Sequence, residues 1–116
     1  MWLKDYVDET KYSFMLSIYG NDFIDNLDYD NFINIYNLFN KYNFYFIDDI
    51  ILNYLEIFQL DVNFVDEKIK YLRHKLGSNF VYEIGNDLRY LEIIVKDLDK
   101  FKSYFDLPNE LEDDVI

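Results

Sequence analysis

The sequence predicts a mostly α-helical fold, a compact bundle of four to five helices with room for a small β-hairpin. Apolar residues recur at helical spacing along most of the 116-residue chain, and acidic residues stand where these stretches begin. With 51% hydrophobic residues the chain has material for one core, and a second core would not fit. We therefore expect one globular domain over residues 1–105 and a loose acidic tail over residues 106–116.

Residues 12–19 are compatible with two structures. In "YSFMLSIY" an apolar residue occupies every second position, so these residues would share one side of a strand. Met15 and Tyr19 also share one face of a helix that would begin near Asp8 and end before Gly20. The helix is the preferred interpretation.

Two further helices follow along the chain. Apolar residues at helical spacing predict a helix over residues 28–41, with Asp28 or Asp30 as its N-cap. Residues 42–46 then form a connection or a short strand. An almost unbroken apolar stripe over residues 47–58 predicts the next helix, whose first turn holds two acids that the helix dipole favours. These two acids are Asp48 and Asp49.

A fourth helix is expected over residues 63–76. Asn63 is its candidate N-cap, and Asp66 and Glu67 would lie in the first turn. Basic residues occupy the last turn, and Gly77 supplies a left-handed stop. The bases of the last turn are Arg73, His74 and Lys75.

The region over residues 79–95 has two interpretations. β-forming residues flank Gly85 and Asn86 on both sides, which suits a hairpin. A hairpin here, together with a strand near 12–19, would give a small α+β domain, and that fold is the alternative to the helical bundle.

A helical rhythm that continues to about residue 105 favours a helix instead. This helix would cover about residues 86–105 and would be capped by Asn86 or Asp87. A shorter helical piece, capped by Ser78, would precede it.

The net charge of −12 is unevenly distributed. Residues 12–67 hold ten acids and one base, a net of −9, whereas residues 68–116 hold ten acids and eight bases. This balance argues against direct nucleic-acid binding, which depends on Lys and Arg, and against docking on anionic membranes. Negative charge also keeps an aromatic-rich chain in solution. Solubility alone does not require the excess to lie in the middle of the chain.

The chain lacks the residues of the common catalytic sites. It has no cysteine, no Gly-x-Ser-x-Gly turn and no glycine-rich phosphate loop. The only histidine, His74, stands among bases at the end of a predicted helix, where a cation is favoured. A calcium loop starting at Asp28 fails, because Ile33 stands where the loop needs glycine and Phe39 where it needs glutamate. We expect no enzymatic activity, cofactor or metal; a magnesium site on one or two carboxylates is the remaining metal hypothesis.

Neither a signal peptide nor a membrane span is predicted. The stretch "MWLKDYVDET" carries charges by position 5 and contains no apolar core. The uncharged runs are about half the length of a membrane span. We expect a cytoplasmic protein, and the bias toward residues with AT-rich codons is associated with low-GC microbes, phages and mobile elements.

The densest acidic stretch is "NDFIDNLDYD" at residues 21–30, which interleaves aspartates with apolar residues and contains no base. Acids three apart on a helix lie about 5–6 Å from each other, comparable with the rise of about 3.4 Å per nucleotide along a DNA strand. The stretch therefore predicts a phosphate-like surface for a basic groove, with tyrosines at its edge. The candidate partner-binding residues are Asp22, Asp25, Asp28, Asp30, Asp48, Asp49, Tyr29, Tyr36, Tyr42 and Tyr45.

The functional hypothesis is a small acidic inhibitor, without enzymatic activity, of a basic nucleic-acid-handling protein such as a nuclease or CRISPR effector. In size and acidity the chain is similar to toxin-immunity proteins and to phage anti-defence proteins of the anti-CRISPR type. In the competing interpretation the same aspartates only cap helices or face water. The second functional hypothesis is a helical adaptor that self-associates or docks through an aromatic stripe. Its stripe would comprise Ile47, Ile51, Tyr54 and Phe58.

Overall fold

The computed structural model describes residues 2–99, with the side chains of residues 2–96. Within this range the chain is helical and contains no strand, so the mostly α prediction is confirmed and the α+β alternative is wrong. None of the described helices has the length and apolarity that crossing a membrane requires. The predicted tail over residues 106–116 lies outside the described residues. The elements are η1 (Trp2–Asp5), α1 (Glu9–Asp25), α2 (Tyr29–Lys41), α3 (Ile47–Asn53), η2 (Leu55–Gln59), α4 (Val62–Leu76), η3 (Gly77–Asn79), α5 (Phe80–Asn86), η4 (Leu88–Leu91) and α6 (Glu92–Asp99).

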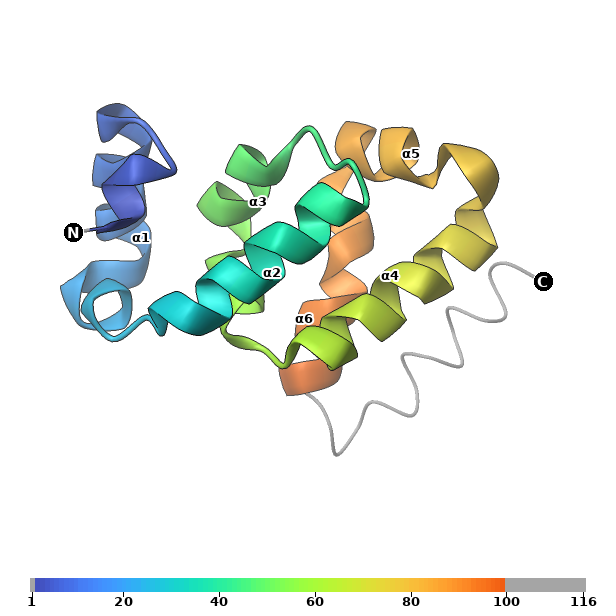
Figure 1. Ribbon diagram of the computed structural model, residues 1–116. Helices are drawn as coiled ribbons and strands as arrows, with labels where there is room; N and C mark the ends of the chain where they lie inside the picture. The colour runs from blue at the N-terminus through green and yellow to red at the C-terminus, as the bar shows by residue number, and fades with distance from the viewer. Residues whose placement is uncertain (1, 100–116) are drawn as a thin grey trace.

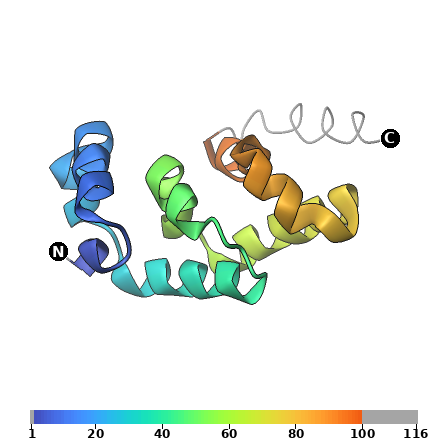
Figure 2. The same cartoon turned by 90° about the horizontal axis from the view of Figure 1, so that it is seen from above.

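Helix α2 lies at the centre of the arrangement and packs against η2 and α4 (Figure 1). Helix α4 packs in turn against α5 and α6, while α3 packs against α2 and η2. The N-terminal η1 and α1 lie at one end, beyond the start of α2, as Figures 1 and 2 both show. The α1–α2 turn and the α4–α5 turn therefore stand at opposite ends of the molecule.

The core is built around buried phenylalanine rings. Phe32 of α2 stacks on Phe58 of η2, with ring centroids 4.8 Å apart and planes inclined by 25°. Phe39, further along α2, meets Phe58 edge to face at 5.5 Å. All three side chains are fully buried. Burying one such ring stabilises the fold by about 1.5–3 kcal/mol, so these contacts fix α2 against η2.

The starts of α1 and α2 agree with the sequence. Asp8 caps α1 and accepts the backbone N–H of Lys11 at 2.7 Å. Gly20 interrupts the helix as expected, with a φ of 84° that favours glycine, but helical structure resumes after it and continues to the end of α1. Of the two candidate caps of α2, Asp28 is the one that the structure uses, and Asp30 lies in the first turn.

The start of α4 differs from the prediction. Asp61 is the N-cap and accepts the backbone N–H of Phe64 at 3.0 Å, so the expectation for Asn63 is wrong. Asp66 and Glu67 consequently lie beyond the first turn. Aspartate and asparagine cap equally well, so the choice between them falls to the contacts with α2 that direct the chain just before the helix. The stop at Gly77 is confirmed.

The helix predicted over residues 47–58 is broken into α3 and η2. The break occurs at Tyr54, whose dihedral angles are φ −139° and ψ 48°. There the backbone N–H of Leu55 donates to the hydroxyl of Tyr19 on α1 at 3.1 Å. The hydroxyl of Tyr54 itself donates to Glu92 of α6 at 3.3 Å. Hydrogen bonds to α1 and α6 therefore take the place of the helical hydrogen bonds that would have continued α3.

The C-terminal third contains two α-helices and two 3-10 turns within the described residues. Asp87 is a cap, as one of the two alternatives predicted, but it caps the short η4 through the backbone N–H of Arg89 at 3.1 Å. Helix α6 begins only at Glu92, and the part of the predicted 86–105 helix beyond residue 99 lies outside the described residues. Ser78 lies in η3 and does not cap α5, so that expectation is wrong.

Gly85 allows the α2–α3 connection to lie against α5. A Cβ atom at Gly85 would stand 2.8 Å from Cζ of Tyr45 and 2.9 Å from Cδ1 of Phe46. Alanine ordinarily stabilises a helix over glycine by about 1 kcal/mol. Because Phe46 is buried and would have to move, we expect Gly85→Ala instead to lower the free energy of unfolding by about 1–3 kcal/mol. Denaturant unfolding of the two proteins measures this difference.

The Tyr45→Ala background provides the control for Gly85→Ala. Tyr45 is 66% exposed, so its removal relieves part of the clash at little cost of its own. The loss caused by Gly85→Ala should therefore be smaller in that background. Stabilisation by Gly85→Ala in the parent chain would contradict the close contact.

Candidate functional site

Two amide side chains fasten the start of α2 to the connection between η2 and α4. Gln59 accepts the backbone N–H of Asp28 at 2.8 Å and donates to the carbonyl of Phe58 at 3.0 Å. Asn31 donates to the carbonyls of Phe58 and Leu60, each at 2.8 Å. The bonds between α2 and the connection join residues 27 to 31 positions apart in the sequence. We call Asn31 and Gln59 the amide clamp.

Exposed aspartates from three elements lie around the amide clamp. The last turn of α1, the start of α2 and the cap of α4 all contribute. The carboxylates of Asp22, Asp25 and Asp30 make no hydrogen bond or ion pair with any other residue that the structure describes. The acidic corner, as we name it, consists of Asp22, Asp25, Asp28, Asp30 and Asp61.

The five aspartates differ in what the fold requires of them. Asp28 and Asp61 are helix caps, at 3.1 and 3.0 Å from the N–H groups that they accept. Asp30 lies in the first turn of α2, where the helix dipole favours a negative charge. Asp22 and Asp25 lie in the last turn of α1, which contains no base. A carboxylate at a helix C-terminus is disfavoured by about 0.3–1 kcal/mol, so the local structure gives these two residues no stabilising role.

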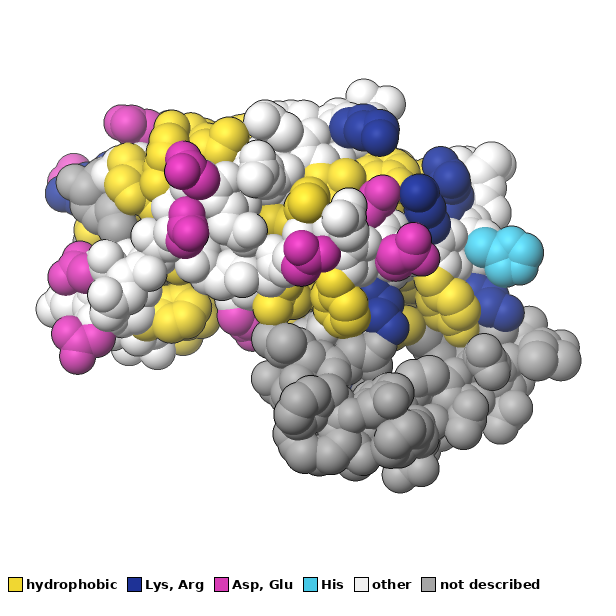
Figure 3. Space-filling view, turned by 60° about the horizontal axis from the view of Figure 1, so that its bottom comes forward, with side chains coloured by type: hydrophobic (Ala, Val, Ile, Leu, Met, Phe, Trp, Pro, Cys, Tyr) yellow, Lys and Arg dark blue, Asp and Glu magenta, His cyan; other side chains and the backbone are white. Residues whose placement is uncertain are grey.

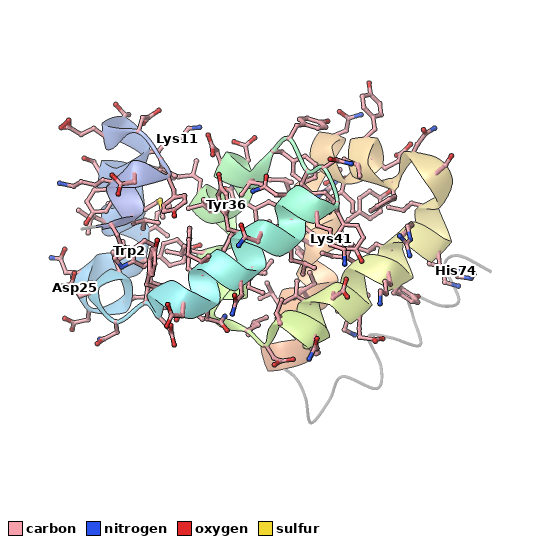
Figure 4. The ribbon with its side chains drawn as sticks, in the orientation of Figure 1. Trp2, Lys11, Asp25, Tyr36, Lys41 and His74 are labelled. Carbon is pink, nitrogen blue, oxygen red and sulfur yellow. The ribbon has the colours of Figure 1, made fainter. Side chains whose placement is uncertain are left out.

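The basic side chains are concentrated toward the end of the molecule that holds the α4–α5 turn. Figure 3 shows acidic side chains along the whole length of one face. Most of the Lys and Arg side chains on that face, and the histidine, lie near one end of the molecule. Asp25 and His74 mark the two ends in Figure 4. On α4, Lys70 pairs with Asp66 one helical turn away at 3.4 Å. Among the described residues, no cation forms an ion pair with the acidic corner.

A solvent-open hollow of about 450 Å³ lies beside the acidic corner. Asp22 at the end of α1 forms part of its wall, and Gln59 of the amide clamp closes the other side. The half-buried ring of Phe23 also lines the hollow and is stacked on Tyr19 at 5.2 Å. The remaining lining residues are Asn26 and Leu27.

Asp48 and Asp49 are not part of the acidic corner. Both are exposed in the first turn of α3. That turn follows the α2–α3 connection and lies away from the α1–α2 turn in the views of Figures 1 and 2. The candidate acids therefore form two groups on different elements.

Tyr29 and Tyr36 pack on aromatic rings of the N-terminal segment. Tyr29, 44% exposed, meets the ring of Trp2 edge to face at 4.8 Å. Tyr36 meets the ring of Tyr6 at 5.0 Å, and Figure 4 shows Trp2 and Tyr36 on this side of α2. A hydrogen bond with Tyr29 raises the pKa of Tyr6 to about 12. Both tyrosines thus attach the N-terminal segment to α2, and only Tyr29 adjoins the acidic corner.

Tyr42 and Tyr45 stand at the other end of α2. The helix has 13 residues, so they lie about 20 Å from its start. Burial raises the pKa of Tyr42 to about 12, helped by the hydrogen bond that its hydroxyl donates to Asp66. Its ring also carries the guanidinium of Arg73 at 5.8 Å. Tyr45 is 66% exposed and is the most accessible of the four candidate tyrosines.

The site chemistry and the comparisons point to no known class. Within the part of the chain that the structure describes, no three Asp, Glu or His side chains converge as metal ligands would. No protein-family model, curated protein or solved structure matches the chain. The charge and shape of the candidate site are therefore the basis on which its function is inferred.

Most aspartates of the acidic corner are predictable from the sequence, whereas the residues of the amide clamp are not. Asn31 and Gln59 act on segments that are far apart in the sequence, and an amide gives no periodic signal. Phe23 was visible only as one apolar residue in an acidic stretch. Asp61 could have been found, because it directly precedes the helical pattern of α4, whereas Asn63 lies within the first turn.

Asn31→Leu tests the amide clamp. The substitution removes the donor to two backbone carbonyls, and a buried acceptor without its partner costs about 1–3 kcal/mol. We expect the free energy of unfolding to fall by that amount in denaturant titrations. Asn34→Leu is the matched control, since Asn34 is exposed one turn along the same helix. Equal effects of the two substitutions would contradict a specific clamp.

Alkaline titration tests the tyrosine environments. Tyr6, Tyr19 and Tyr42 have pKa values raised from 10.0 to about 12, the first by its hydrogen bond with Tyr29 and the others mainly by burial. The folded state therefore holds these protons more tightly than the unfolded chain. Their contribution to stability is complete below about pH 10 and is lost as the pH rises through about 12.

Phenolate absorbance and circular dichroism measured together from pH 8 to 12.5 check this expectation. Tyr6, Tyr19 and Tyr42 should ionise only at about pH 12, and the helix content should fall as they do. Ionisation of every tyrosine near pH 10 without loss of helix would contradict these environments.

Proposed function

We propose that this chain is a small acidic inhibitor that binds a basic nucleic-acid-handling protein, with the acidic corner occupying the place of nucleic-acid phosphates. The observation that carries the proposal is the position of Asp22 and Asp25. Their carboxylates are exposed at the unfavourable end of α1, without a described cation. Exposed charges that the fold does not use are available to a partner.

The mounting of the acidic corner favours binding. The amide clamp fixes the backbone beside Asp28, Asp30 and Asp61, so little ordering of these residues is needed when a partner arrives. Several like charges on one corner steer a basic surface toward it and raise the association rate at low salt. Tyr29, beside Asp28 and Asp30, adds an exposed ring of the kind that strengthens interfaces.

The other candidate residues have a secondary place in this proposal. Asp48 and Asp49 belong to α3, and Tyr45 belongs to the connection before it. A partner of ordinary interface size, about 800 Å² on each side, covers these residues only if it extends across α2. We therefore assign them to the edge of the interface.

A helical adaptor is the second candidate function, favoured by the outer side of α1. Phe14 and Ile18 are 51% and 54% exposed and stand four residues apart, one helical turn. Such an apolar pair suits docking into a larger assembly. Most of the stripe proposed for this role from the sequence is buried, because Ile47, Ile51 and Phe58 belong to the core.

Salt-dependent capture with charge variants tests the inhibitor. The full chain is immobilised and incubated with nucleic-acid-handling proteins at about 50 and about 500 mM salt. Over this range the Debye screening length shortens severalfold. We expect capture at low salt that is lost at high salt and competed by duplex DNA or RNA. Changing Asp22, Asp25, Asp28 and Asp30 together to Asn should abolish it.

The quadruple variant should fold at least as stably as the parent. Asparagine caps α2 as well as aspartate does, and removing two charges from the end of α1 adds about 0.5–2 kcal/mol. The matched control changes four exposed acids elsewhere, Asp5, Glu9, Glu67 and Glu83, to their amides. Capture that survives the corner variant as well as it survives the control would contradict the proposal, and capture lost only with Phe14→Ser and Ile18→Ser would favour the adaptor.

A further inference from the structure

We propose that the hollow beside the acidic corner is a binding pocket for one arginine side chain of the partner protein. The inference rests on the proposed function, because it identifies the group of the partner that the acidic corner receives. It adds a specific pocket to what is otherwise a general charge attraction.

Apart from one N–H of Asn26, the polar groups that remain available in the hollow are hydrogen-bond acceptors. The amide of Gln59 is already used, since it accepts from Asp28 and donates to Phe58. The Nδ2 group of Asn26 donates one of its two N–H groups to the carbonyl of Asp22 at 2.8 Å, and its Oδ1 atom remains available as an acceptor. The carboxylate of Asp22 has no partner among the described residues. A ligand that fits must supply donors and a positive charge.

The remaining walls are apolar and aromatic. Phe23 is half-buried and held by stacking on Tyr19 with a ring separation of 5.2 Å and an angle of 21°. Leu27 is 8% exposed and forms a firm apolar wall. An aromatic face next to a carboxylate suits a side chain that has an apolar stem and a flat cationic end.

Arginine fits these walls better than lysine. Its guanidinium is planar, stacks on an aromatic ring and can meet a carboxylate with two parallel hydrogen bonds. The ammonium of lysine is compact and strongly hydrated, and it gains less from the face of Phe23. The volume of about 450 Å³ lies within the range of about 300–1,000 Å³ found for small-ligand pockets, so an extended side chain is accommodated.

The shape and charge exclude the other simple ligands. An anion would meet the carboxylate of Asp22 and no described cation. A metal ion would find one carboxylate and one amide oxygen, whereas no three ligands converge here within the described residues. A cationic side chain is the ligand class that uses both the acceptors and the ring.

Binding of a short peptide to the isotope-labelled full chain tests the pocket by nuclear magnetic resonance. The probe is acetyl-Gly-Arg-Gly-amide, compared with the same peptide carrying lysine or the uncharged arginine analogue citrulline. We expect the arginine peptide to bind with a millimolar Kd and to shift the amide signals of residues 22–27 and the side-chain amide of Gln59. The lysine peptide should bind about threefold more weakly, and the citrulline peptide should not saturate.

Matched variants separate the pocket from the general charge. Asp22→Asn and Asp25→Asn each remove one charge from the same turn, but only Asp22 lines the hollow. We expect Asp22→Asn to weaken the arginine peptide by about threefold to fivefold, as for a largely exposed charge pair, and Asp25→Asn by less than about twofold. Phe23→Leu, checked for an unchanged melting temperature, should remove the preference for arginine over lysine.

The outcomes distinguish this inference from the proposed function. Equal weakening by Asp22→Asn and Asp25→Asn, or shifts spread over α3 as well, would overturn the pocket, while partner capture that still depends on the corner would leave the inhibitor standing. Failure of the inhibitor looks different, because no partner is captured although the arginine peptide still titrates the hollow.

Discussion

The junction between α2 and η2 is the contact on which the rest of the structure depends. Inside it, Phe32 and Phe58 stack at 4.8 Å; at its edge, Asn31 and Gln59 bond across the same two elements. Burial of rings is strong but non-directional, and it would tolerate a small rotation of α2. The hydrogen bonds of the two side-chain amides would not tolerate this rotation, because the carbonyl of Phe58 accepts from both amides. One register of α2 results, and with it the positions of the α1–α2 turn and of α4.

A structural feature could be predicted from the sequence when the interacting residues are close together along the chain. The caps at Asp8 and Asp28 act over three residues, and the stop at Gly77 depends on its own backbone angle, so local patterns reveal them. The break at Tyr54 depends instead on partners in α1 and α6 that lie 36 to 38 residues away, which periodicity cannot detect. The candidate site divides in the same way. Its aspartates were evident from composition, whereas the amide clamp and the hollow exist only once distant segments meet.

The abundance of tyrosine has a structural explanation that reduces its value as a sign of binding. The chain contains no alanine, and half-buried tyrosine rings pack against its core. Tyr36 and Tyr42 are rings of this kind, packed on Tyr6 and on Phe44 and Phe80. Tyr29 and Tyr45 keep enough exposed surface to contact a partner.

Many of the acidic residues also have a structural role. Asp8, Asp28, Asp61 and Asp87 are caps, and a folded chain needs caps whatever it binds. The charge count alone is therefore a weak argument for an acidic interface. Asp22 and Asp25 are the exception, since folding would be better served by a base or an amide at the end of α1. A charge kept where it lowers stability is the kind of compromise that binding sites make. One of the two, Asp22, also lines a hollow with an aromatic wall, and for this reason we propose that the surplus charge serves binding.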